Sequence, residues 1–151
     1  MKSAFRMALA VAAVSAAVAG CFNEPEPAYK TVPEGARVYL SDKGLKDLRG
    51  QSFDASVVDY LNLDRNQLTN VDEVASLASL KWLRLNGNRL SSLPDLSKLS
   101  GLRRIYLRGN GFAAVPETLK DLPSLDSIDI SENPLAEIPD WLAAKRGKIM
   151  Y

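Results

Sequence analysis

The chain has 151 residues, a hydrophobic content of 46%, a charged content of 25% and a formal net charge of +1 at pH 7. This length suggests one domain, the composition is ordinary for a soluble globular fold, and the near-zero charge argues against a general binder of polyanions. The sequence has no histidine and one cysteine. An intrachain disulfide and a zinc site built on His or Cys ligands are therefore excluded.

Residues 1–20 differ in composition from the rest of the chain. Lys2 and Arg6 give them a positive start, and residues 7–19 form an alanine-rich apolar run. A basic start, an apolar run of this length and small residues before Cys21 are typical of a secretory signal peptide. An uncleaved membrane anchor is the less favoured alternative, because the run is shorter than the roughly 20 residues that a spanning helix needs.

The end of this segment, Val18-Ala19-Gly20-Cys21, resembles the lipobox of bacterial lipoproteins, with valine where leucine is usual. The resemblance implies that Cys21 is diacylated and becomes the mature N-terminus. Two acyl chains anchor a protein stably, whereas one holds it only reversibly. The expected location is the bacterial cell envelope, periplasmic or surface-facing. The outer membrane is favoured, because Phe22 is not the aspartate that retains enterobacterial lipoproteins at the inner membrane.

The segment after the cysteine is rich in proline, with Pro25, Pro27 and Pro33. Proline disfavours regular secondary structure, so residues 21–34 are expected to form a lipidated cysteine followed by a short extended tether. The folded domain is then expected to occupy residues 35–151, terminal caps included.

Four similar segments recur within this folded part. They cover residues 58–68, 80–90, 102–112 and 125–135, and each has an asparagine at its ninth position: Asn66, Asn88, Asn110 and Asn133. The pattern resembles the leucine-rich repeat, L-x-x-L-x-L-x-x-N-x-L. The resemblance implies an α/β solenoid of about five coils. Short parallel strands would line its concave side, and 3₁₀, short helical and irregular segments its convex side.

The residue types fit such a coil. Leu83 and Leu85 are two positions apart, so on a strand both side chains point to the interior. Asn88 would be costly to bury without partners, but its amide has donors and an acceptor for the backbone of its own turn and of the next coil. Gly87 and Gly109 precede asparagines, where a tight turn favours a residue without a Cβ. We therefore expect the asparagines to be structural.

The terminal coils are expected to be degenerate, because they cap the core. Val38 and Leu40 take the strand positions of the first coil, and Leu48, Phe53 and Val57 are expected to bury its return segment. Trp141, Leu142, Ile149 and Met150 are expected to cap the last coil.

The return segments between the strands carry apolar residues at three-residue spacing, which suits 3₁₀ turns. Residues 72–79 are rich enough in alanine to form a turn or two of α-helix. Pro116 and Pro139 are each expected to open a helical turn, because proline is tolerated at a first helical position.

Motifs of catalysis are missing. No Gly-rich phosphate loop follows a predicted strand, and neither H-E-x-x-H nor G-x-S-x-G occurs. Asp126, Asp129 and Glu132 are interpreted as a solvated face of one repeat, and the spacing of a calcium-binding EF-hand loop is absent. We therefore expect a protein that is not an enzyme and has no cofactor and no metal.

The variable positions beside the strand leucines point away from the core, to the concave side. Six of them on neighbouring coils belong to types enriched at binding hot spots: Tyr60, Trp82, Arg84, Arg104, Tyr106 and Arg108. Leucine-rich repeats commonly bind through this face, so the resemblance implies a solvent-exposed, partner-binding patch. The alternative is a self-paired ladder, in which Trp82 stacks with Arg104 and Asp64 pairs with Arg84.

The sequence thus predicts a lipid-anchored, monomeric module that binds a protein partner. A binder of an envelope polymer, peptidoglycan or lipopolysaccharide, is the alternative, because arginine suits anionic groups and aromatic rings pack on sugars. Nucleic acid is not an expected partner, since export and the near-zero net charge argue against it.

Overall fold

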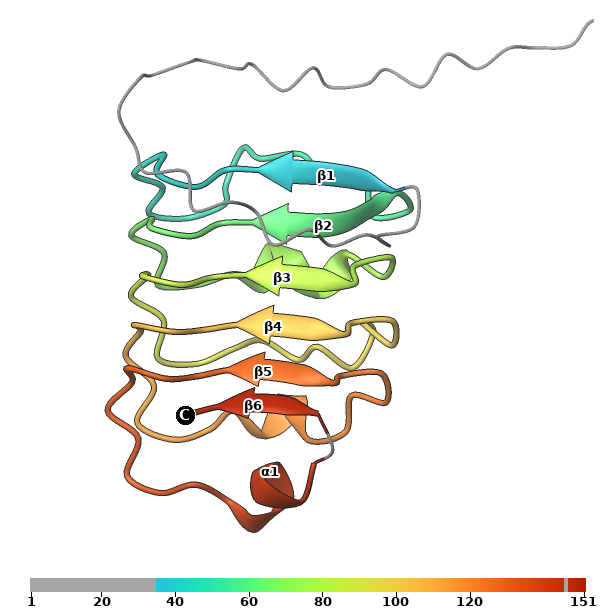
Figure 1. The fold of residues 1–151 in the computed structure, drawn as a ribbon. Helices are drawn as coiled ribbons and strands as arrows, with labels where there is room; N and C mark the ends of the chain where they lie inside the picture. Colours follow the sequence, from blue (N-terminus) through green and yellow to red (C-terminus); the bar gives the residue numbers. More distant parts are fainter. Residues whose placement is uncertain (1–34, 146) are drawn as a thin grey trace, which may run out of the picture. The chain divides into compact units, whose positions relative to one another are not determined.

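The computed structural model describes residues 35–145 and 147–151. The expected signal peptide (1–20), the lipidation of Cys21 and the tether (21–34) lie outside the described residues. Six parallel strands form one sheet in the order β1-β2-β3-β4-β5-β6, so each strand lies beside the next in sequence (Figure 1). The strands are β1 (Ala36–Tyr39), β2 (Val58–Asn62), β3 (Trp82–Arg84), β4 (Arg104–Tyr106), β5 (Ser127–Asp129) and β6 (Lys148–Met150). This confirms the predicted leucine-rich repeat solenoid.

Equivalent residues of successive repeats lie side by side in the sheet. Leu61 pairs with Leu83, Leu83 with Ile105, and Ile105 with Ile128. All four side chains are at most 1% exposed. Each coil therefore adds one apolar rung to a continuous core behind the sheet, as the alternation of side chains on a strand requires.

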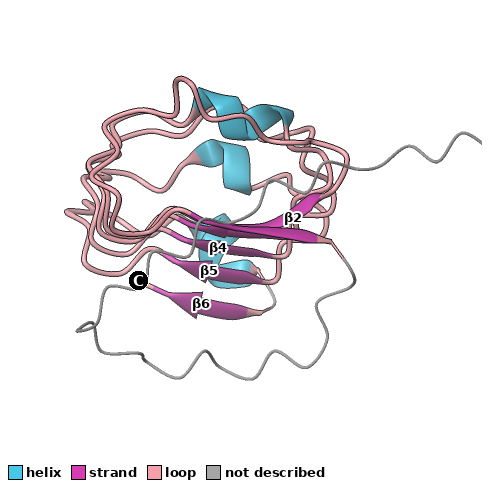
Figure 2. Cartoon of the chain, turned by 90° about the horizontal axis from the view of Figure 1, so that it is seen from above, coloured by secondary structure: helices cyan, strands magenta, loops and turns pink. Residues whose placement is uncertain are grey.

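Short helical segments and loops close the coils away from the strands (Figure 2). They are the 3₁₀ helices η1 (Asp72–Ser76) and η2 (Glu117–Leu119) and the α-helix α1 (Asp140–Ala144). Pro116 and Pro139 stand at the N-caps of η2 and α1, as predicted. Their φ angles of −61° and −69° are those that the proline ring imposes.

The segment that follows β2 is a 3₁₀ helix and not the α-helical turn expected for residues 72–79. The N–H of Val74 donates to the carbonyl of Val71 at 3.0 Å, and the N–H of Leu77 to that of Val74 at 3.0 Å. Leu80 continues the series with a 2.9 Å bond to Leu77. All four side chains are at most 1% exposed. A series of four apolar residues at three-residue spacing stays on one face in a 3₁₀ arrangement, whereas in an α-helix it drifts by about 60° at each step. Burial of all four side chains therefore favours the 3₁₀ helix.

Two features of the terminal coils differ from expectation. Val57 is 46% exposed, because it lies in the turn before β2, where its N–H donates to the carbonyl of Asp54, and Val58 takes the buried position. At the other end, Ile149 and Met150 belong to a sixth strand. The N–H of Ile130 donates to the carbonyl of Met150 at 2.8 Å. β6 thus supplies hydrogen-bond partners that the last coil would otherwise lack.

The asparagines join each coil to its neighbour. Nδ2 of Asn110 donates to the carbonyls of Leu85 and Leu107, both at 2.9 Å, and Oδ1 accepts the N–H of Leu90 at 3.1 Å. Leu85 and Leu90 belong to the preceding coil, not to the next one as expected. The repeat spacing is the same in both directions, so the sequence alone left the direction open. Asn88 bonds backward in the same way, to the carbonyl of Leu63.

The residue before the asparagine position has a left-handed backbone in each of the five coils. Gly87 and Gly109 have φ angles of +64° and +66°, in line with the predicted need for glycine. Asp42, Arg65 and Glu132 adopt φ angles of +57°, +54° and +55° although they carry a Cβ. The coil therefore imposes this turn whatever the residue, at an expense of about 1–3 kcal/mol for a residue other than glycine.

Candidate functional site

Five of the six candidate residues lie on β2, β3 and β4, on the face of the sheet opposite to the core, and Arg108 follows β4. The register pairs Tyr60 with Trp82, Trp82 with Arg104, and Arg84 with Tyr106. We call this surface the outer sheet face. Its first column is Arg37, Tyr60, Trp82, Arg104, Ser127 and Lys148; its second is Tyr39, Asn62, Arg84, Tyr106, Asp129 and Met150. A third column follows the strands with Ser41, Asp64, Asn86, Arg108 and Ser131.

Two guanidinium–ring pairs lie at the centre of the outer sheet face. Cζ of Arg104 is 4.6 Å from the centroid of the Trp82 ring, and Cζ of Arg84 is 5.7 Å from that of the Tyr106 ring. β3 carries Trp82 and Arg84, whereas β4 carries Arg104 and Tyr106. The two arginines therefore occupy one diagonal of a square and the two rings the other. Each pair brings a cation over a ring face, which is attractive.

Contacts between aromatic rings continue from Trp82 toward β1. The ring centroids of Tyr60 and Trp82 are 6.0 Å apart in an edge-on arrangement, and those of Tyr39 and Tyr60 are 5.3 Å apart. Such tilted contacts are favourable for aromatic pairs. Tyr39 is 42% exposed, but Tyr60 and Trp82 are only 6% and 8% exposed. The expectation that these two side chains face solvent is wrong, because neighbouring rings and Arg104 pack against them.

The predicted pair between Asp64 and Arg84 is present. Nη2 of Arg84 lies 2.6 Å from Oδ2 of Asp64, whose other oxygen accepts the N–H of Asn86 at 2.8 Å. Burial raises the pKa of Asp64, and the charge of Arg84 and the N–H of Asn86 oppose this only in part. Burial works against the charge of Arg84, but Asp64 and Tyr60 outweigh it and raise the arginine pKa. Both contacts of the self-paired ladder therefore exist in the fold.

Comparison with known protein families matches residues 36–90, 56–112 and 78–135 to the family described as Leucine rich repeat. Together these matches span residues 36–135, well over half of the chain. The chain belongs to the leucine-rich repeat family. Domains of this family are generally protein-interaction modules and are typically non-catalytic. A comparison with curated proteins finds no significant match.

The acidic residues of the last full repeat have partners within the leucine-rich repeat domain. Asp126 pairs with Arg103 at 2.9 Å, and Glu132 pairs with Arg108, which lowers the pKa of Glu132. Asp129, expected on a solvated face, is only 7% exposed. Its Oδ1 accepts the N–H and the hydroxyl of Ser131 at 3.1 and 2.6 Å. These two bonds hold the Asp129 carboxylate against its own turn. The interpretation of Asp129 as part of a solvated face is therefore wrong.

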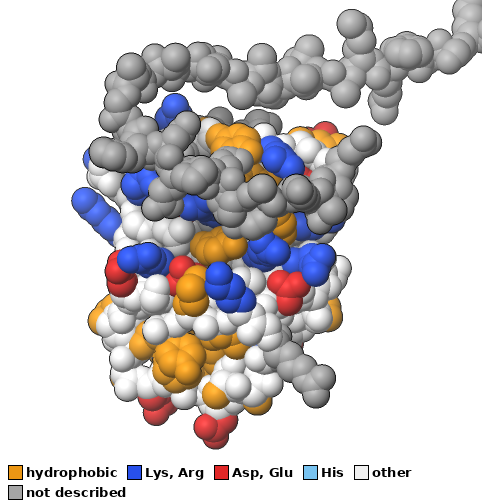
Figure 3. Space-filling view, in the orientation of Figure 1, with side chains coloured by type: hydrophobic (Ala, Val, Ile, Leu, Met, Phe, Trp, Pro, Cys, Tyr) orange, Lys and Arg blue, Asp and Glu red, His pale blue; other side chains and the backbone are white. Residues whose placement is uncertain are grey.

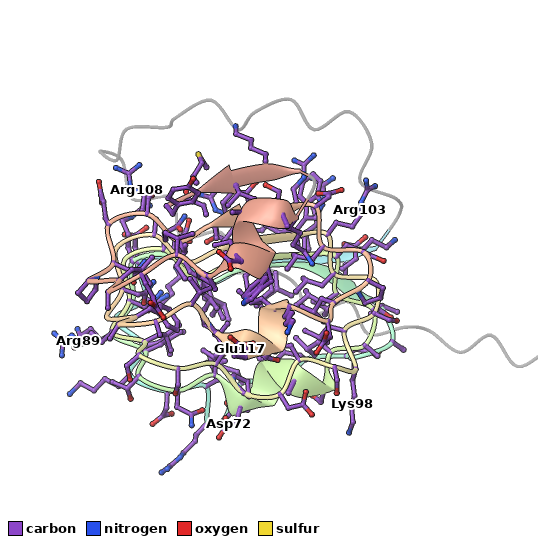
Figure 4. All side chains as sticks on the ribbon, turned by 90° about the horizontal axis from the view of Figure 1, so that it is seen from below. Asp72, Arg89, Lys98, Arg103, Arg108 and Glu117 are labelled. Carbon is purple, nitrogen blue, oxygen red and sulfur yellow. The ribbon has the colours of Figure 1, made fainter. Side chains whose placement is uncertain are left out.

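Sequence reasoning missed two further features. A shallow cleft of about 400 Å³ lies between the return segments of two coils, lined by residues 91–93 and 113–118. Figure 4 shows one lining residue, Glu117, on the side away from Arg103 and Arg108. The second feature is Asp59, which is 3% exposed with no hydrogen bond to its carboxylate in the described structure. No repeat pattern marks either feature, because each depends on how neighbouring coils meet.

Residues 35–145 and 147–151 contain no cluster of three or more Cys, Asp or Glu side chains placed to hold a metal ion. Within the same ranges, every helix is too short or too polar to cross a membrane.

Proposed function

We propose that this protein is a lipid-anchored, non-catalytic module of the bacterial cell envelope whose leucine-rich repeat domain binds a protein partner through the outer sheet face. Family membership supports the general role, since leucine-rich repeat domains are generally protein-interaction modules. The choice of face rests on the two guanidinium–ring contacts between β3 and β4.

These contacts favour binding because they hold the side chains in place before a partner arrives. Arg104 rests on Trp82, and Arg84 is fixed between Asp64 and Tyr106. Side chains that are already ordered lose little conformational entropy on binding. Arginine, tyrosine and tryptophan are also the types that most often dominate binding energy. The half-buried Arg84, Arg104 and Tyr106 and the exposed Arg108 would form the contact surface, with Tyr60 and Trp82 supporting it from below.

The anchor is supported by the pattern of residues 1–21. The basic start, the apolar run and the lipobox-like ending before Cys21 together favour export and lipidation. We expect a monomer that stays in the envelope through its lipid, with the outer membrane favoured. Cys21→Ala should abolish incorporation of radiolabelled palmitate, and equal labelling of the variant and the native protein would refute the anchor.

A second candidate function is binding of an anionic envelope polymer. The arginines of the outer sheet face favour it, because guanidinium groups suit carboxylate and phosphate. Sugar binding by stacking needs an accessible ring face, and the low exposure of Tyr60 and Trp82 weighs against it. A protein partner therefore remains the better supported proposal.

The test is crosslinking and capture on intact cells. Arg104→Ala/Tyr106→Ala should lose the captured protein, whereas Arg89→Ala/Lys98→Ala, which removes two exposed cations away from the outer sheet face, should retain it (Figure 4). Thermal unfolding of each variant would show that both still fold. Undiminished capture by Arg104→Ala/Tyr106→Ala would show that the partner binds elsewhere on the protein. Binding to purified peptidoglycan or lipopolysaccharide, lost in the same variant, would favour the polymer.

A further inference from the structure

We propose that the partner presents an extended acidic segment, which lies across the strands of the outer sheet face. This inference rests on the proposed function and adds the chemistry of the partner. It is carried by the distribution of charge over the three columns of that face and by the spacing of the cations within one column.

The outer sheet face is more basic than the chain as a whole. Its columns contain two acidic residues and five basic ones: Arg37, Arg84, Arg104, Arg108 and Lys148. That is a surplus of three positive charges, although 19 basic and 18 acidic residues leave the whole chain with a surplus of one. The two acidic residues, Asp64 and Asp129, are 2% and 7% exposed. The exposed charge within the three columns is therefore positive, and just outside them the exposed Glu132 pairs with Arg108.

The basic side chains are interleaved with hydrophobic ones. Figure 3 shows Lys and Arg side chains across the middle of this face with hydrophobic side chains among them. In the first column, Tyr60 and Trp82 separate Arg37 from Arg104, and Ser127 separates Arg104 from Lys148. A uniformly charged polymer is best matched by a continuous row of cations. An interrupted row matches a peptide whose acidic residues alternate with other types.

The register gives the spacing that such a peptide needs. Arg37 is on β1, Arg104 on β4 and Lys148 on β6, so these residues are three and two strands apart. With neighbouring strands about 4.8 Å apart, the separations are roughly 14 and 10 Å. An extended peptide advances about 3.3 Å per residue, so acidic residues about four and then three positions apart would meet the three cations in turn.

Because Arg104 stacks on Trp82, it is well suited to bind an acidic side chain of the peptide. The contact with the ring uses the face of the guanidinium group. The N–H donors lie in the plane of the group, and they can bind a carboxylate with two parallel hydrogen bonds. Tyr39, 42% exposed, and the half-buried Tyr106 would pack against the other residues of the peptide.

The experiment uses the full chain in neutral detergent and two fluorescent 12-residue peptides. One has glutamates at positions 2, 6 and 9 of the peptide, and the other has glutamines there. Fluorescence anisotropy should show the glutamate peptide binding about tenfold tighter or more. The difference should shrink as salt rises from roughly 50 to 300 mM, because salt screens exposed charges. Equal binding of both peptides, or no binding of either, would overturn the proposal.

Variants then locate the contact. Arg104→Gln should weaken binding of the glutamate peptide about tenfold, while Lys98→Gln, which removes an exposed cation on the opposite side, should leave it unchanged (Figure 4). Equal losses in both variants, or tighter binding of dextran sulfate than of the peptide, would refute an acidic peptide as the partner. If cell crosslinking still captures a protein through the outer sheet face, the proposed function survives that refutation. If cell crosslinking captures no protein through the outer sheet face, the proposed function is refuted as well.

Discussion

Asp64 and Arg84 sit on neighbouring coils with 2.6 Å between Oδ2 and Nη2, and the carboxylate is almost completely buried. The second oxygen of Asp64 holds the backbone N–H of Asn86. One carboxylate thus ties down both a side chain of β3 and the turn after it. Four ion pairs are found among the described residues, and in the other three both side chains are at least 40% exposed.

This contrast predicts different stabilities for two matched variants. Asp64→Ala should lower the free energy of unfolding by about 2–3 kcal/mol, because a hydrogen-bonded charge and a backbone donor lose their acceptor. Asp42→Ala removes the partner of Arg65 in an exposed pair and should cost at most about 1 kcal/mol. Urea unfolding measures both. Similar losses would mean that burial does not strengthen the Asp64 pair.

Asn133, the last of the four repeat asparagines, should contribute as much to stability as Asn88. Oδ1 of Asn133 accepts the N–H groups of Asn110 and Phe112, both at 3.2 Å, and Nδ2 donates to the carbonyl of Leu107 at 3.0 Å. Asn133→Ala should therefore destabilise by about 1–3 kcal/mol, as should Asn88→Ala. Position near the C-terminal cap alone would suggest a smaller effect. The midpoints of urea unfolding of the two variants test this prediction. An unchanged midpoint for Asn133→Ala would show that water replaces these hydrogen bonds.

Asp59 should make stability depend on pH with an unusual sign. Its carboxylate packs against Gly35, where an added Cβ would clash with Oδ2. Burial raises its pKa, and Lys81 and Arg37 offset this only in part. The folded state thus holds this proton more tightly than the unfolded one. Protonation of Asp59 therefore stabilises the folded state fully below the ordinary pKa of 3.8. This stabilisation is lost as pH rises through the pKa that Asp59 has in the folded state.

Asp59→Asn should accordingly stabilise the protein by about 1–2 kcal/mol at neutral pH. The gain should vanish below the ordinary pKa, where the native side chain is protonated too. Urea unfolding of variant and native protein at both pH values gives the two differences. A gain that does not change with pH would show that charge burial is not its cause.

Gly147 should be required for the pairing of β6. Its φ is +141°, and an added Cβ would clash with the carbonyl oxygen of Asp126, which accepts the N–H of Lys148 at 2.9 Å. Gly147→Ala should cost about 2 kcal/mol or more and speed amide exchange at Lys148, whose N–H makes the bond to β5. Gly101→Ala is the control, because its added Cβ would meet only an ordinary contact of 3.9 Å. Undisturbed exchange at Lys148 would contradict the prediction.

The repeat spacing accounts for most of what the sequence predicted. Asparagines 22 or 23 residues apart set the register, and alternation on a strand then separates core rungs such as Leu83 from outer positions such as Trp82. The columns of the candidate site followed directly, including the stack of Arg104 on Trp82. These features depend on period alone, which a single sequence contains.

Exposure could not be predicted in the same way. Trp82 and Asp129 occupy outer positions, yet contacts with side chains of other coils or of the same turn bury them. β6 was missed because three residues without a following repeat give no period to detect. The left-handed backbone at Arg65 was hidden for a related reason, since the turn is imposed by the coil and not by the residue. Such properties arise between coils, where one sequence holds no direct signal.

The backward direction of the asparagine bonds gives the coils an order of completion during synthesis. The N–H of Leu68 has its native acceptor in Asn88, and that of Leu90 in Asn110, each 20 residues further along the chain. A coil leaving the ribosome therefore cannot close its own turn until almost a whole repeat has followed it. Growth of the stack is directional, and each newly made repeat finishes the one before.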